Sequence, residues 1–187
     1  MNNNIYMNNN NILSKEDLLL SSLYEYYNNE NRLSQLIPII TGKTKLSLRI
    51  LDWFVTNYSK KPNQVIYKIN RNNEEINFNV HQDYKNKLKS YNKRFFDPFC
   101  RKNKKNLKNK IAFKYDDNKY IITTIGQLNF FRWVIRNKIV LHILNNFKEI
   151  TDTLRNTKKR IKIKKIIKIN IKNKNENEIE RIVDFNK

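Results

Sequence analysis

The chain has 187 residues and a net charge of +21, with only two glycines, three prolines and one cysteine. So few glycines exclude a glycine-rich phosphate-binding loop, and a single cysteine excludes an internal disulfide bond. No apolar run is long enough to span a membrane, and the asparagine-rich N-terminus lacks the charged and apolar regions of a secretory signal. We therefore expect a protein of a reducing compartment that is neither secreted nor inserted into a membrane.

The positive charge is concentrated in the second half of the chain. In successive stretches of fifty residues the excess of Lys and Arg over Asp and Glu is +1, +4 and +9, and it is +7 over the last 37 residues. A field of this size attracts polyanions, so we expect a nucleic acid, either DNA or RNA, as the partner. The alternative source of the charge is an AT-rich genome, whose codons favour asparagine, lysine and isoleucine.

The first half of the chain begins with an asparagine-rich extension over residues 1–12, which we expect to be disordered. A first helix is predicted to begin at Ser14, whose hydroxyl can cap it, with Asp17 at the capping-box position. Residues 33–40 are interpreted as a short apolar turn that contains a proline. Apolar residues at helical spacing then predict a helix over 46–58.

Two hairpins follow, and each precedes a helix. The first hairpin, over 64–80, leads into a basic helix over 82–93, and the second, over 111–123, leads into a long helix over 124–150. These elements predict an α+β fold with one antiparallel sheet of about four strands, N-terminal helices and flexible tails. We expect one domain over 13–157 and, over 158–187, either a basic C-terminal arm or an edge strand protected by lysines.

Some residues resemble parts of catalytic or metal sites but lack the necessary partners. The Thr-Gly-Lys-Thr run at 41–44 ends like a P-loop, yet Ile37 stands where that loop needs a glycine. Cys100 with His81 and His142 gives too few ligands for a structural zinc ion, and no local motif supports a pair of nucleophile and base. We therefore expect no enzymatic activity, no cofactor and no metal.

A metal-dependent nuclease is the enzymatic hypothesis that stays open. Asp83 and Lys85 have the spacing that such enzymes use on a strand, but they fall on a predicted helix. The hypothesis requires Asp52, Asp83 and Asp97 to converge in a cleft.

The segment 84–101, basic and rich in aromatic residues, is the best candidate for a binding site. Its cations can contact phosphates, while Tyr84 and Tyr91 can stack on bases. Two arginines four residues apart on the long helix extend the patch, and the basic run 158–168 adds sequence-independent affinity. The alternative is a solvated helix face. The predicted nucleic-acid-binding residues are Lys85, Lys87, Lys89, Tyr91, Lys93, Arg94, Arg101, Lys102, Arg132 and Arg136.

Three blocks of the sequence carry a resemblance to a known group of proteins. They read SLRILDWFVTNY at 47–58, FFDPFCR at the end of 84–101, and TTIGQLNFFRW at 123–133. Together they resemble a family of small uncharacterised proteins encoded by giant nucleocytoplasmic large DNA viruses, over about 47–145. The resemblance implies a viral protein that acts in a cytoplasmic viral factory of the host or is packaged in the virion.

The same blocks contain polar residues among their aromatic ones. We interpret Asp52, Asp97, Gln127 and Asn129 as structural rather than functional, for example as residues that cap turns or pair with an arginine.

We therefore expect a non-enzymatic, basic nucleic-acid-binding accessory protein of a large DNA virus, with contacts mainly to the phosphate backbone. No helix-turn-helix, RNP motif or zinc finger indicates sequence-specific recognition. The alternative is a structural virion protein or complex-assembly protein whose basic surface binds an acidic protein partner.

Overall fold

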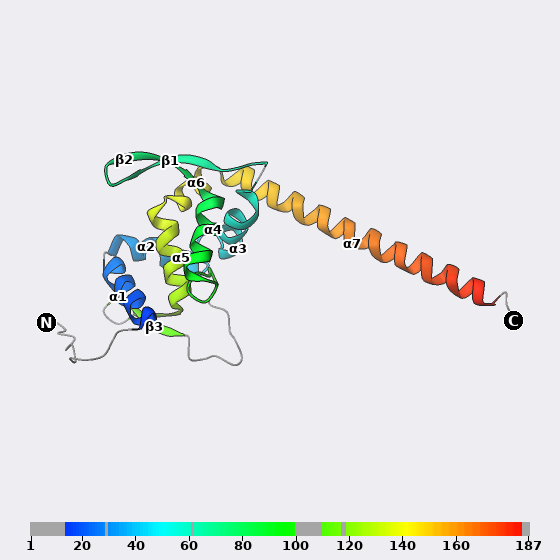
Figure 1. Ribbon diagram of the computed structural model, residues 1–187, viewed down its shortest axis with the longest axis horizontal. Coiled ribbons are helices and arrows are strands. Elements are labelled where there is room, and N and C mark those ends of the chain that lie inside the picture. The colour runs from blue at the N-terminus through cyan, green and yellow to red at the C-terminus, as the bar shows by residue number, and fades with distance from the viewer. Residues whose placement is uncertain (1–13, 29, 61, 100–109, 117–118, 185–187) are drawn as a thin grey trace. The chain divides into compact units, whose positions relative to one another are not determined.

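The computed structural model of the chain describes residues 14–28, 30–60, 62–99, 110–116 and 119–184 (Figure 1). It divides into two compact units, Met1–His142 and Ile143–Lys187, which we describe separately. The expected asparagine-rich extension over 1–12 lies outside the described residues. None of the described helices is long and apolar enough to cross a membrane.

Helix α1, Lys15–Tyr27, begins as its sequence predicts. The backbone N–H of Asp17 donates to the Ser14 hydroxyl at 3.1 Å, and the Ser14 N–H donates to the Asp17 carboxylate at 3.2 Å. This reciprocal capping box satisfies two of the N–H groups that a helix start leaves without partners.

Helix α2, Glu30–Ile40, occupies the segment for which the sequence predicted an apolar turn, so that prediction was wrong. Leu33, Leu36 and Ile39 are buried at helical spacing, and their burial outweighs the cost of Pro38 inside the helix. The helix ends two residues after the proline.

The predicted helix over 46–58 is present as two consecutive pieces. Helix α3, Leu48–Trp53, starts at the cap Ser47, and the π-helical turn η1, Phe54–Tyr58, continues it. Leu51, Phe54 and Val55 are fully buried.

Both predicted hairpins are present, and each is followed by a helix. Strands β1, Ile66–Arg71, and β2, Glu74–Asn79, pair antiparallel and lead into helix α4, Val80–Tyr91. Strands β3, Ile111–Asp116, and β4, Lys119–Thr123, pair antiparallel and lead into helix α5, Ile125–Arg136. The α+β fold class is therefore confirmed.

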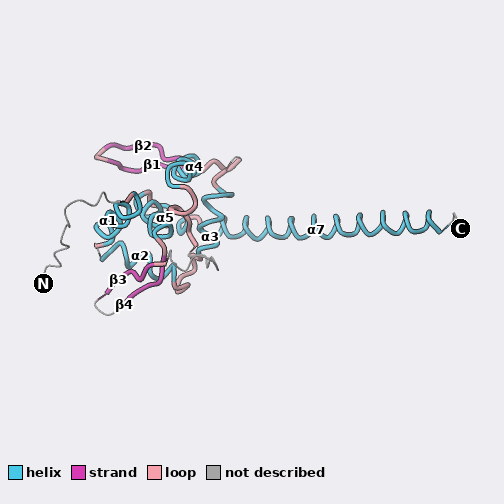
Figure 2. Tube along the Cα trace, turned by 60° about the horizontal axis from the view of Figure 1, so that its bottom comes forward, coloured by secondary structure: helices cyan, strands magenta, loops and turns pink. Residues whose placement is uncertain are grey.

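The single four-stranded sheet that the sequence predicted is not formed by the described strands. The hairpins make two separate two-stranded sheets, which lie near opposite ends of α5 (Figures 1 and 2). Nine of the twelve α5 residues are buried, and the other three, Arg132, Ile135 and Arg136, share the one face that is partly open. Each hairpin bonds to one end of this helix, and the described strands of the two hairpins do not pair with each other.

Asparagine occupies most of the left-handed backbone positions. The turn between β1 and β2 consists of Asn72 and Asn73, with φ of 52° and 67°, and Asn92 after α4 has φ of 54°. Two such residues in a row form the turn that matches the twist of a hairpin, and asparagine tolerates this conformation better than most side chains.

The long helix predicted over 124–150 is broken twice, so that prediction was wrong. After α5 the chain turns at Asn137 and Lys138, the latter with φ of 54°, and continues as α6, Ile139–Asn145. The Asn137 amide donates to the carbonyl of Trp133 at 2.7 Å, and the Asn137 carbonyl accepts from the Tyr67 hydroxyl at 2.7 Å. These bonds replace the helical ones and fix the break.

Helix α7, Phe147–Asp184, is continuous over 38 residues in the second unit. The edge-strand alternative for the C-terminal segment was therefore wrong. Its isoleucines alternate only locally with lysines and also recur at spacings of three and four, and lysine favours helices over strands.

Segment 94–98 is anchored along the start of α5 by polar groups. The Gln127 amide donates to the Pro98 carbonyl and the Asn129 amide to the Phe95 carbonyl, both at 2.8 Å. At Gly126 a Cβ atom would lie 2.6 Å from the backbone oxygen of Arg94, so only glycine permits this approach. Gln127 and Asn129 thus have the structural role that the sequence indicated.

Candidate functional site

A pocket of about 480 Å³ lies in the first unit, between the tip of hairpin β1–β2, helix α4 and helix α5. Four cations line it: Arg71 from β1, Lys87 from α4, and Arg132 and Arg136 from α5. No acidic side chain is among the described residues that line it. The four cations also form no ion pair with any residue of the described ranges. This concave surface therefore carries uncompensated positive charge.

Neutral amides hold two of these arginines in place. The Arg71 guanidinium donates to the Asn137 side-chain oxygen at 2.9 Å, and the Arg132 guanidinium donates to the Asn129 side-chain oxygen at 2.8 Å. Arg132 also donates to the Ser22 hydroxyl at 2.9 Å. A carboxylate would orient a guanidinium equally well but would cancel its charge, whereas an amide oxygen leaves the charge available.

The two amides are themselves rigidly placed. Asn129 is 2% exposed and Asn137 is 3% exposed, and each donates its own N–H to a backbone carbonyl. The positions of Asn129 on α5 and of Asn137 just after it are fixed by these bonds and by burial, so the two guanidinium groups are oriented before any ligand arrives.

Arginines also surround Tyr26 of α1. The Arg32 guanidinium lies 4.3 Å from the centre of the Tyr26 ring, and the Arg136 guanidinium lies 5.7 Å from it. Burial raises the pKa of Tyr26, while Arg32, Arg136 and Arg132 oppose that shift. The tyrosine stays neutral and leaves the charge of the arginines uncancelled.

Three aromatic side chains also line the pocket. Trp133 and Phe96 belong to the core, with ring centres 5.5 Å apart, and Tyr91 stacks on Phe96 at 6.2 Å. The Trp133 indole N–H donates to the Asp83 carboxylate, so one negative charge lies next to Trp133. Tyr84 packs against Phe96 and Trp133. The two tyrosines predicted to stack on bases thus both pack against core rings.

The structure brings together four of the ten predicted binding residues and separates the others. Lys87, Tyr91, Arg132 and Arg136 line the pocket. Three of the others are exposed outside the lining, and Arg94 forms an ion pair with Glu16 at 2.6 Å. Two more lie outside the described residues. The three exposed residues are Lys85, Lys89 and Lys93, and the two undescribed ones are Arg101 and Lys102.

Sequence reasoning missed Arg71 and the asparagines that accompany it. Arg71 ends β1, and Asn70 and Asn72 flank it at the hairpin tip. They reach the pocket only through tertiary folding, because 60 or more residues separate them from the arginines of α5. No local spacing signals that contact.

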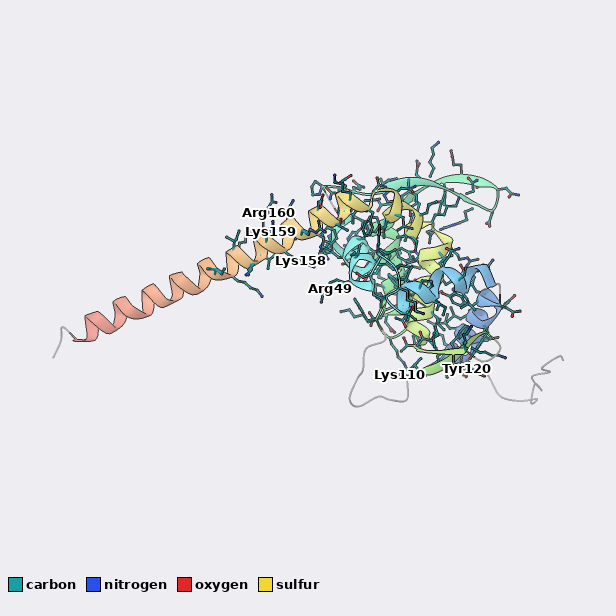
Figure 3. The ribbon with its side chains drawn as sticks, turned by 180° about the vertical axis from the view of Figure 1, so that it is seen from behind. Arg49, Lys110, Tyr120, Lys158, Lys159 and Arg160 are labelled. Atoms are coloured by element: carbon teal, nitrogen blue, oxygen red, sulfur yellow. The ribbon has the colours of Figure 1, made fainter. Side chains whose placement is uncertain are left out.

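A second basic surface lies on α7 in the second unit. Six of the eight residues over 158–165 are Lys or Arg, and all eight are exposed. Figure 3 shows Lys158, Lys159 and Arg160 projecting from this helix. The stretch from 153 to 175 contains no Asp or Glu.

The candidate residues for metal or nucleophilic chemistry are dispersed. Within the described ranges, His, Cys, Asp and Glu never gather in groups of three, so Asp52, Asp83 and Asp97 do not form the cluster that a nuclease site requires. His142 lies between the rings of Phe54 and Tyr67 as a packing residue. Cys100, for which no motif in the sequence supports a pair of nucleophile and base, lies outside the described residues.

Comparison with known proteins places the chain in a family. It belongs to the family of unknown function DUF7197, whose sequence profile matches residues 1–186. Among curated proteins, the chain is similar to the uncharacterized protein L507 of Acanthamoeba polyphaga mimivirus, with 41% identity over 164 residues. The match covers 84% of this chain and 61% of L507, so the chain spans about three fifths of that relative's length. No solved structure matches the chain. The resemblance to an uncharacterised family of giant viruses is thus confirmed.

Proposed function

We propose that this protein is a non-enzymatic nucleic-acid-binding accessory protein of a large DNA virus, with contacts mainly to phosphates. The observation that carries the proposal is the pocket in which Arg71, Lys87, Arg132 and Arg136 converge without an acidic residue in the lining. Proteins rarely hold four unpaired cations together, because the charges repel one another unless an anion joins them.

The chemistry of these groups suits phosphate. A guanidinium presents planar N–H donors that match two phosphate oxygens at once, and a lysine ammonium adds a mobile point charge. Contacts of this kind carry no sequence information, so we propose binding that depends on backbone charge rather than on base identity.

The cationic stretch 158–165 of α7 supports the same proposal. A helix with lysines on all its faces binds phosphates without a fixed register, and its counterion release adds to the salt dependence of binding. Its two neighbouring isoleucines, Ile161 and Ile163, are also exposed, at 51% and 56%.

The proposal is tested by fluorescence anisotropy with labelled duplex DNA, single-stranded DNA and RNA over a salt titration. The logarithm of the affinity should fall linearly with the logarithm of salt concentration, by about 0.7 to 0.9 per phosphate neutralised. In the double variant Lys87→Glu/Arg136→Glu the affinity and this slope should both fall.

The matched control is Lys43→Glu/Lys45→Glu, which makes the same change in net charge at two exposed lysines between α2 and α3. It should retain most of the affinity. Equal losses in both double variants would show that only net charge matters, and no binding by the wild type at near-physiological salt would refute the proposal.

The second candidate function is a structural or assembly role with an acidic protein partner. Tyr120 and Ile122 favour it, because they lie on one face of β4 and are 59% and 58% exposed. Lys119 begins β4, and Figure 3 shows Lys110 near Tyr120. An apolar face beside lysines fits a protein surface better than a phosphate backbone. Equal affinity for poly-glutamate and for single-stranded nucleic acid of matched charge would favour this second role.

A further inference from the structure

We infer that the pocket holds a cluster of adjacent phosphates, as in a nucleoside triphosphate or the 5′-triphosphate end of an RNA. This inference rests on the proposed function and names the part of the nucleic acid that the pocket binds. The pocket and the α7 stretch 158–165 would then both contribute contacts to ordinary backbone phosphates, and the pocket alone would distinguish the clustered ones.

The first argument is the balance of charge. Arg71, Lys87, Arg132 and Arg136 bring four positive charges to one pocket of about 480 Å³. A backbone phosphodiester carries a single charge, and successive ones are spread along the strand. A phosphate monoester alone carries about 1.5 to 2 negative charges, so a terminal di- or triphosphate approaches the charge of the pocket within one compact group.

The second argument is geometry. The cations project from three different elements, β1, α4 and α5, so they approach a ligand from different sides. A concave site that encloses a ligand suits a chain end or a small molecule, whereas a continuous duplex requires an open groove. Two of the guanidinium groups are already held by buried amides, so little side-chain freedom is lost on binding.

The third argument is the composition of the rim. Asn70 and Asn72 are exposed at the hairpin tip and offer neutral donors and acceptors beside the cations. Amide side chains both donate and accept hydrogen bonds and carry no charge, so they can bind a sugar hydroxyl or the edge of a base. The pocket therefore combines cations that suit phosphates with neutral polar groups that suit the nucleoside that carries them.

The test compares three RNAs of one sequence that differ only in carrying a 5′-hydroxyl, a 5′-monophosphate or a 5′-triphosphate. With full-length protein, anisotropy should show the 5′-triphosphate RNA binding at least about tenfold tighter than the 5′-hydroxyl RNA, which corresponds to one charge-assisted hydrogen bond. Unlabelled inorganic tripolyphosphate should displace the 5′-triphosphate RNA at concentrations too low to act through ionic strength.

Variants locate the effect in the pocket. Lys87→Gln/Arg136→Gln should abolish the preference for the 5′-triphosphate while the affinity for the 5′-hydroxyl RNA falls much less. The control Lys43→Gln/Lys45→Gln should keep the preference. Unchanged thermal unfolding of both double variants would show that neither result comes from loss of the fold.

The two sources of clustered phosphate are separated by competition with free nucleoside triphosphate. The labelled 5′-triphosphate RNA is competed with tripolyphosphate, with unlabelled 5′-triphosphate RNA and with free nucleoside triphosphate. If only the first two displace it, the pocket is assigned to RNA ends. If free nucleoside triphosphate displaces it equally well, the pocket is assigned to nucleotides. Equal affinity for all three RNAs would overturn the inference and leave the proposed function standing. Binding of tripolyphosphate without binding of any RNA would support the inference that the pocket binds clustered phosphates, and it would refute the proposed function.

Discussion

Replacing Gln127 with methionine should destabilise the first unit by about 2–6 kcal/mol. The Gln127 side chain is 1% exposed, donates to the Pro98 carbonyl at 2.8 Å and accepts from the Thr123 hydroxyl at 2.8 Å. Methionine has nearly the same length and volume, so no large cavity forms. Two buried polar groups lose their partner, however, and each such loss costs about 1–3 kcal/mol.

The assay is thermal and urea unfolding followed by tryptophan fluorescence, because Trp53 and Trp133 both lie in the first unit. In a chain of this size each kcal/mol lowers Tm by about 2–4 °C, so we expect a fall of at least about 4 °C. The matched control is Gln82→Met on the exposed side of α4, which should change stability by no more than about 0.5 kcal/mol. A fall in Tm of less than about 2 °C for Gln127→Met, or the same fall in the control, would refute this account of the polar core.

Three further predictions concern other parts of the fold. Gly126→Ala should lower the urea midpoint strongly, because the new Cβ would lie 2.6 Å from the Arg94 backbone oxygen, and an unchanged midpoint would contradict that contact. Ser14→Ala removes the capping-box hydroxyl and should cost about 1 kcal/mol in urea unfolding, whereas the exposed Ser21→Ala should cost nothing. Burial raises the pKa of Tyr67, so its contribution to stability is complete below about pH 10 and is lost as the pH rises toward the folded-state pKa. Urea midpoints from about pH 8 to about pH 11 should therefore fall, and they should fall less steeply in Tyr67→Phe than in the wild type.

Local sequence signals were sufficient to predict the elements whose bounds are set by residues close to them in the sequence. The start of α1 follows from Ser14 and Asp17, and both hairpins follow from alternating apolar residues around polar turns. Helix α2 was missed because Pro38 suggested an interruption, while the burial of its leucines could be known only from the folded chain. The break after α5 was missed for a similar reason, since Asn137 is fixed by a tyrosine 70 residues away.

The same distinction applies to the candidate site. Lys87 was predicted as one of the cations of the basic segment 84–101, Arg132 and Arg136 were predicted from their spacing of four residues, and the pocket contains all three. Arg71 was not predicted, because its contribution depends on the packing of a hairpin against α5. The uncompensated charge of the pocket also depends on which residues accept hydrogen bonds from the arginines, and no sequence pattern distinguishes an asparagine in that role from one in a loop.

The asparagines at left-handed positions have a consequence for how this chain can evolve. Glycine codons begin with two G bases, whereas asparagine codons consist almost wholly of A and T, and Asn72, Asn73 and Asn92 occupy conformations that glycine fills in most proteins. A chain with 33 asparagines and two glycines can therefore keep its turns if its gene drifts toward A and T. At these three sites the residue that an AT-rich gene would favour is one that the backbone can use.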